Sequence, residues 1–187
     1  VAITYTNNDY GKGLADVYAA AVKAHGIKVT TTAAHEDGKA DYSAEVATLA
    51  SAGGDAVAVI GYLDQGGKGI IQGSLDSGAF DTFVLSDGMI GDSLTDTFGK
   101  DLNKSFGSLP GSTGKGAGIF AKVAKAAGID SSGPYTSESY DAAALITLAM
   151  QAGGKADRAT IQKNVMSVAN ARGKKIYLGV VKKALDL

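Results

Sequence analysis

Three side chains with complementary chemistry each follow a predicted strand in this chain of 187 residues: Tyr10, Tyr62 and Asp87. A carboxylate pairs with an ammonium group, and two phenols add ring surface and a hydrogen bond. Together they would form half of a pocket for a small cation with an apolar body. Tyrosine and aspartate are also ordinary turn residues, and the spacing alone leaves that alternative open.

These side chains depend on strands that must place them at one edge of a sheet. The sequence predicts buried strands at Val1–Thr6, Ile27–Ala33, Ala56–Ile60, Thr82–Leu85 and Lys104–Leu109. Helical patterns of apolar residues separate them. This alternation predicts an α/β fold with a three-layer, flavodoxin-like parallel sheet in the order 2-1-3-4-5. Such sheets bind ligands beyond the carboxyl ends of their strands, where the strand order reverses.

The alternation of predicted strands and helices stops near residue 130. Residues 1–130 are expected to form the α/β lobe, and residues 131–187 a helical extension. In the extension, helices are expected at Tyr140–Met150 and Thr160–Val168, and a last strand at Lys175–Val181.

The composition excludes several classes of function. Apolar residues make up 45% of the chain, and the net charge of −1 favours neither a nucleic-acid partner nor an anionic membrane. The absence of cysteine excludes thiol catalysis, cysteine-based zinc sites and disulfides. No apolar run approaches the ~20 residues that span a bilayer, so no membrane insertion is expected.

Other candidate sites are weaker. The segment Gly11–Gly13 lacks the third glycine of a dinucleotide fingerprint, and Gly111–Gly116 lacks both a glycine and the hydroxyl residue of a phosphate loop. His25 and His35 are expected to be solvated. No serine stands in a nucleophile-elbow motif. We therefore expect a protein without catalytic residues, metal or cofactor, and not an enzyme.

Several motifs in order carry a resemblance that covers nearly the whole chain. They are the opening Val1–Leu14, Asp41-Tyr42-Ser43, Ala56–Tyr62, Leu85–Gly88, Gly133–Tyr135 and Tyr140–Ala143. Together they resemble the carboxy-terminal lobe of type I periplasmic binding proteins of the leucine/isoleucine/valine-binding family. These proteins are the substrate-binding components of ABC importers.

The resemblance implies a periplasmic parent protein that binds an amino acid and meets the membrane subunits of an ABC transporter. It implies that Tyr10 and Tyr62 line the ligand cleft and that Asp87 receives the α-ammonium group. The family usually has glutamate at this last position, one methylene longer. The family's other lobe, which holds the ligand carboxylate, has no counterpart in this sequence. The chain is therefore interpreted as a truncated or engineered lobe, weak or inactive alone. The alternative is a flavodoxin-like scaffold that retains no ligand binding.

The predicted late helices also carry a nearly continuous apolar stretch, Leu145–Met150. A helix that is apolar around most of its circumference needs partners on more than one side. Either the helices fold back on their own sheet or two chains share them. We expect a homodimer.

Overall fold

The computed structural model describes residues 1–111 and 114–170 and divides the chain into two compact units, Val1–Leu109 and Pro110–Leu187. The division falls earlier than the boundary that the sequence suggested near residue 130. One reason is that helix α5 (Lys115–Ala126) packs with helix α6 (Thr136–Gly153) in the second unit. The rings of Phe120 and Tyr140 meet edge to face there, with centroids 5.7 Å apart.

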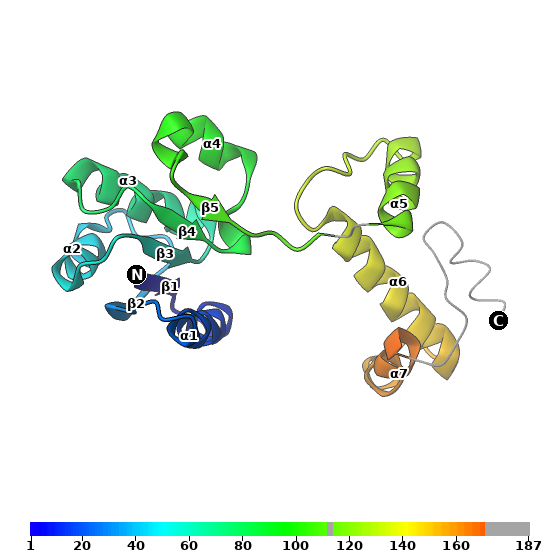
Figure 1. The fold of residues 1–187 in the computed structure, drawn as a ribbon. Coiled ribbons are helices and arrows are strands. Elements are labelled where there is room, and N and C mark those ends of the chain that lie inside the picture. Colours follow the sequence, from blue (N-terminus) through cyan, green and yellow to red (C-terminus); the bar gives the residue numbers. More distant parts are fainter. Residues whose placement is uncertain (112–113, 171–187) are drawn as a thin grey trace. The chain divides into compact units, whose positions relative to one another are not determined.

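A five-stranded parallel sheet forms the centre of the first unit (Figure 1). Its order, β2-β1-β3-β4-β5, confirms the predicted order 2-1-3-4-5. The strands are β1 (Ala2–Thr6), β2 (Thr31–His35), β3 (Val57–Ile60), β4 (Phe83–Leu85) and β5 (Phe106–Gly107). β3 is buried at all four positions, as expected for a strand covered on both faces.

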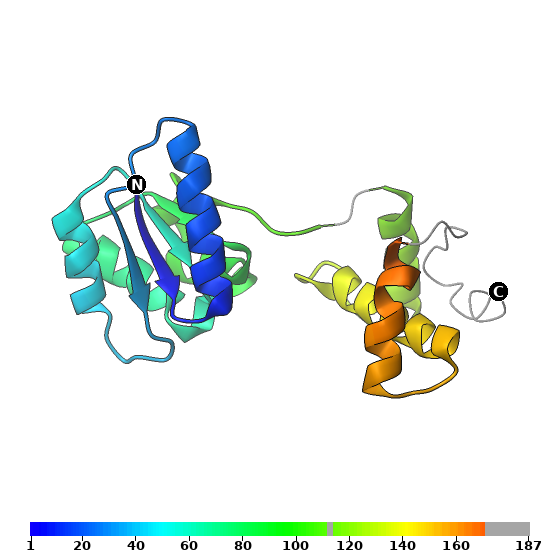
Figure 2. The same cartoon turned by 90° about the horizontal axis from the view of Figure 1, so that it is seen from below.

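Helices cover the two faces of this sheet unequally. Residues of α2 (Ser43–Ala52), α3 (Gly67–Ser77) and α4 (Asp92–Phe98) share one apolar cluster with Val57, Val59 and Phe83. α1 (Asp9–Ala24) packs on the opposite face and lies beside β1 in Figure 2. Short 3₁₀ turns, η1 (Leu63–Gln65), η2 (Asp87–Met89) and η3 (Gly99–Leu102), complete the connections.

The second strand lies later in the chain than predicted. The expected range Ile27–Ala33 is wrong, because β2 occupies Thr31–His35. Ile27 instead closes the end of α1, where its amide donates to Val22 O and its side chain stays 48% exposed. The β-branched run therefore begins in a connection, and the parallel pairing of Thr6 with His35 sets the strand's end.

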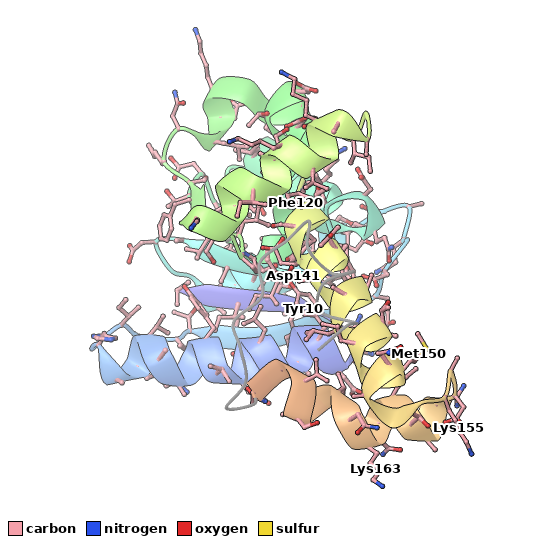
Figure 3. All side chains as sticks on the ribbon, turned by 90° about the vertical axis from the view of Figure 1, so that its right-hand side faces the viewer. Tyr10, Phe120, Asp141, Met150, Lys155 and Lys163 are labelled. Atoms are coloured by element: carbon pink, nitrogen blue, oxygen red, sulfur yellow. The ribbon has the colours of Figure 1, made fainter. Side chains whose placement is uncertain are left out.

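Helices dominate the described part of the second unit. α5 and α6 are followed by α7 (Arg158–Asn170), which confirms the two late helices, each longer than predicted. Their side chains are drawn in Figure 3, with Met150 on α6 and Lys155 in the turn to α7. The strand predicted at Lys175–Val181 lies outside the described residues.

Candidate functional site

Tyr10 is held at the carboxyl edge of the sheet by a tight strand-to-helix turn. It is the second residue of α1, which begins three residues after β1 ends. The Asn8 side chain caps this helix by accepting a hydrogen bond from Gly11 N at 2.9 Å. A Cβ atom at Gly11 would lie 2.1 Å from Thr6 O, so only glycine lets the helix start so close to the strand.

Tyr62 and Asp87 reach the same edge from the neighbouring strands. Tyr62 follows β3 and Gly61, and Asp87 is the first residue of η2, just after β4. The two loops touch through backbone, because a Cβ atom on Gly88 would lie only 2.3 Å from Gly61 O. Glycine at position 88 thus permits the close approach of the segment that carries Asp87 to the segment that carries Tyr62.

The structure brings the three predicted residues together in what we call the edge cluster: Tyr10, Tyr62 and Asp87. The Tyr10 hydroxyl donates to Asp87 Oδ1 at 2.6 Å. The two tyrosine rings stack, with centroids 5.3 Å apart and an interplanar angle of 25°. All three side chains are half-buried. They lie shortly after the carboxyl ends of β1, β3 and β4, and the strand order reverses between β1 and β3.

The environment keeps the Tyr10 phenol protonated. Burial raises the pKa of Tyr10 above its ordinary value, and the hydrogen bond to Asp87 raises it further. The negative charge of the pair therefore stays on the carboxylate. Gly88 N also approaches the phenol oxygen at 3.4 Å. The arrangement offers a carboxylate beside a stacked pair of rings, which suits a cation attached to an apolar group.

Ser86 contacts the edge cluster and was not among the site residues predicted from the sequence. Its Oγ accepts from Gly61 N at 3.2 Å and lies 3.1 Å from the Tyr10 hydroxyl. The residue is 7% exposed. A hydroxyl at the end of a buried strand was the available signal, because backbone groups there need polar partners.

His35 lies beneath the same edge, and its predicted solvation is wrong. It ends β2 with 2% of its surface exposed, and its Nδ1 lies 2.8 Å from Thr4 Oγ1. A Cβ atom on Gly61 would lie 3.0 Å from His35 Nε2. Burial lowers the pKa of His35, against the opposing effect of nearby carboxylates. His25, by contrast, is exposed at the end of α1, as predicted.

The described residues hold no group of three or more His, Asp or Glu side chains placed to share a metal ion. The Gly11–Gly13 segment lies within α1, and Gly111–Gly116 falls partly outside the described residues. Within the same described part, no helix combines the length and apolar character needed to cross a membrane.

Several solved structures that share this fold are named as periplasmic or extracellular binding proteins. A type 1 periplasmic binding protein from Bordetella pertussis Tohama I matches over 96% of this chain and 51% of its own, with 23% identity and a TM-score of 0.73. The chain shares its fold with about half of that protein.

Two further solved structures share this fold over most of the chain. A leucine-binding protein from Thermotoga maritima MSB8 matches over 88% of this chain and 48% of its own, with 19% identity and a TM-score of 0.66. An extracellular ligand-binding receptor from Rhodopseudomonas palustris matches over 89% of this chain and 51% of its own, with 15% identity and a TM-score of 0.67. No protein-family model and no curated protein sequence matches the chain.

Proposed function

We propose that this chain is the amino-acid-binding lobe of a periplasmic binding protein that serves an ABC importer. The observation that carries the proposal is the edge cluster, which sits where an open parallel sheet of this order binds its ligands. In this proposal Asp87 receives the α-ammonium group. The stacked rings of Tyr10 and Tyr62 contact the apolar side chain of a branched-chain amino acid. The leucine-binding name of one structural neighbour supports this ligand class.

The hydrogen bond between Tyr10 and Asp87 is compatible with this role. A carboxylate has two oxygens and about four acceptor positions, so it accepts from both a phenol and an ammonium group. Tyr10 donates to Oδ1 and so restrains the rotation of the carboxylate. The ligand then meets a charge that is already oriented, which reduces the ordering cost of binding.

The affinity of this chain for free amino acids is expected to be millimolar or weaker. The chain spans about half the length of the structures it matches. In this proposal the other half of such a protein holds the ligand carboxylate. Losing a partner for one charged group costs about 2–5 kcal/mol, or roughly thirty- to several-thousand-fold in affinity. A closed receptor with micromolar affinity would therefore become a weak binder as a lone lobe.

A titration with leucine, followed by amide NMR, tests this function. We expect fast-exchange shifts at Tyr62 and Gly88, and none with N-acetylleucine, whose nitrogen carries no charge. Asp87→Asn should abolish the shifts. Asp96→Asn, an equivalent change at an exposed position on α4, should leave them intact.

Two results would contradict parts of the proposal. A micromolar dissociation constant for leucine would refute the argument that the ligand carboxylate lacks its partner. No shift at any soluble concentration of leucine, isoleucine or valine would refute amino-acid binding. That second result would favour the alternative of a scaffold without retained ligand binding.

We infer that the parent protein is periplasmic, meets the membrane subunits of an importer and is not an enzyme. The names of the structural neighbours, periplasmic and extracellular binding proteins, support the location and the binding role. An exported receptor of this class releases its ligand unchanged. The inference that the protein is not an enzyme is tested by incubating it with leucine for a long time and recovering the leucine chemically intact.

We also propose that the isolated chain forms a homodimer through its second unit. Among residues described between 110 and 170, only Phe120, Ala124 and Ala149 are buried. Ile146 is 43% exposed and Met166 66% exposed. Such apolar surface favours association, and one self-complementary patch suffices for a twofold dimer.

A further inference from the structure

The side chain of Ser86 contacts all the loops that build the edge cluster. It stands between β4 and Asp87, and its backbone is fixed because Ser86 N donates to Val59 O at 3.2 Å. Its Oγ reaches Gly61 N, in the loop after β3, at 3.2 Å. The same atom reaches the hydroxyl of Tyr10, in the first turn of α1, at 3.1 Å. One buried hydroxyl therefore bridges the loops that follow β1, β3 and β4.

The number of protons on each group determines which group donates in each of these hydrogen bonds. Gly61 N–H can only donate, so Ser86 Oγ accepts from it. The phenol has one proton, and the 2.6 Å contact with the Asp87 carboxylate takes it, because charge-assisted bonds are short and strong. The 3.1 Å contact between Ser86 and Tyr10 is then left to the serine proton. The result is an ordered chain from Gly61 N–H through Ser86 and Tyr10 to Asp87.

We propose that Ser86 is a positioning residue that holds the Tyr10 hydroxyl against Asp87 and so orients the carboxylate before a ligand arrives. Its relevance to ligands rests on the binding function proposed above. Bonds in a chain of this kind polarise one another, so the serine bond strengthens the bond between phenol and carboxylate. A serine that served only as an acceptor for Gly61 N–H would satisfy the backbone without affecting Tyr10.

The test compares Ser86→Ala with Ser74→Ala in ligand-free protein. Ser74 is the matched control because it is fully buried and its Oγ has no hydrogen-bond partner in the described structure. The titration of Tyr10 is followed by NMR of ¹³C-labelled tyrosine, and the signal is assigned by its loss in Tyr10→Phe. Hydrogen exchange of the Gly61 amide is measured in the same samples.

We expect Ser86→Ala to raise the pKa of Tyr10, because a hydrogen bond that stabilises the phenolate is lost. Exchange of the Gly61 amide should become roughly five- to tenfold faster, the usual effect of one lost hydrogen bond. Ser74→Ala should leave the pKa of Tyr10 unchanged and should not accelerate exchange of the Gly61 amide. Ser86→Thr, which keeps the hydroxyl and guards against misfolding of the alanine variant, should retain both parent values.

An unchanged Tyr10 pKa in Ser86→Ala would overturn the proposal, even if Gly61 exchange accelerates. A raised Tyr10 pKa in a folded Ser86→Thr variant would overturn it as well. These measurements use no ligand, so they stand apart from the proposed function. If the parent chain binds leucine, Ser86→Ala should weaken binding about five- to tenfold. If the parent chain binds nothing, the binding function fails and the positioning result remains.

Discussion

Replacing Gly88 by alanine should destabilise the first unit and separate the edge cluster. The added Cβ would lie 2.3 Å from Gly61 O, 3.2 Å from Tyr62 Cδ1 and 3.3 Å from the Tyr10 hydroxyl. Close carbon–oxygen contacts in proteins are about 3.3–3.6 Å, so one backbone segment must move by about 1 Å. Neither the loop after β3 nor the loop after β4 moves freely, because Ser86 is hydrogen-bonded to Gly61 and to Val59.

The magnitude follows from three contributions. Overpacking at a rigid position costs about 1–3 kcal/mol. Loss of the stacked tyrosine pair costs up to about 1.5 kcal/mol. The smaller conformational freedom of alanine in the unfolded chain returns about 0.4–1 kcal/mol. These contributions sum to about 0–4 kcal/mol, and we expect the free energy of unfolding to fall by about 2 kcal/mol.

Gly13→Ala provides the control. Gly13 lies inside α1, and a Cβ there would meet nothing within 4 Å, so this variant should gain about 0.5–1 kcal/mol. Unfolding in urea is monitored by hydrogen-exchange mass spectrometry of peptides from β1 and β3, so the readout reports on the first unit alone. Near-UV circular dichroism reports on the tyrosine pair. If Gly88→Ala proves as stable as Gly13→Ala and keeps its tyrosine signal, the argument from close approach is wrong.

Three further predictions concern other parts of the chain. Ser74→Ala should raise the free energy of unfolding by about 1 kcal/mol in urea melts, because it removes a buried hydroxyl that has no hydrogen-bond partner among the described residues. A loss of stability would show that the hydroxyl is satisfied. His35 is held neutral, so below its unfolded pKa of about 6.5 the unfolded chain binds more protons. The free energy of unfolding should therefore decline as the pH falls from about 6.5 toward the lower folded pKa, and it should stay level above about pH 6.5. The variant His35→Gln should flatten this decline. The same slope in the variant would show that another group causes the effect. Light scattering at micromolar concentration should give twice 18.8 kDa, whereas a concentration-independent mass of 18.8 kDa would exclude the homodimer.

The meeting of the edge cluster was predictable once the flavodoxin-like strand order was assumed, although the sequence alone does not determine that order. Parallel strands that alternate with helices end at the same edge, so residues just after β1, β3 and β4 had to become neighbours. Tyr10, Tyr62 and Asp87 were found in this way. Their contact with a ligand stays a prediction.

Other features depend on tertiary contacts that no local pattern contains. β2 was misplaced because β-branched residues at Val29–Thr32 indicate extended chain but not which residues pair. His35 was expected in solvent because its neighbours Glu36 and Asp37 are polar. His35 is buried because it occupies the last position of β2, beside β1, where its ring contacts Thr4. Ser86 was missed because its two partners lie far away along the sequence.

The stacked tyrosine pair also gives the molecule an intrinsic optical reporter. The chain contains eight tyrosines and no tryptophan, so its ultraviolet emission comes from phenol rings. Two of those rings lie face to face in the edge cluster, and one donates its proton toward a carboxylate. Any event that parts the rings or competes for that proton should change the emission. Unlabelled protein can therefore be screened for ligands by fluorescence, with Tyr10→Phe as the control for the signal of the cluster.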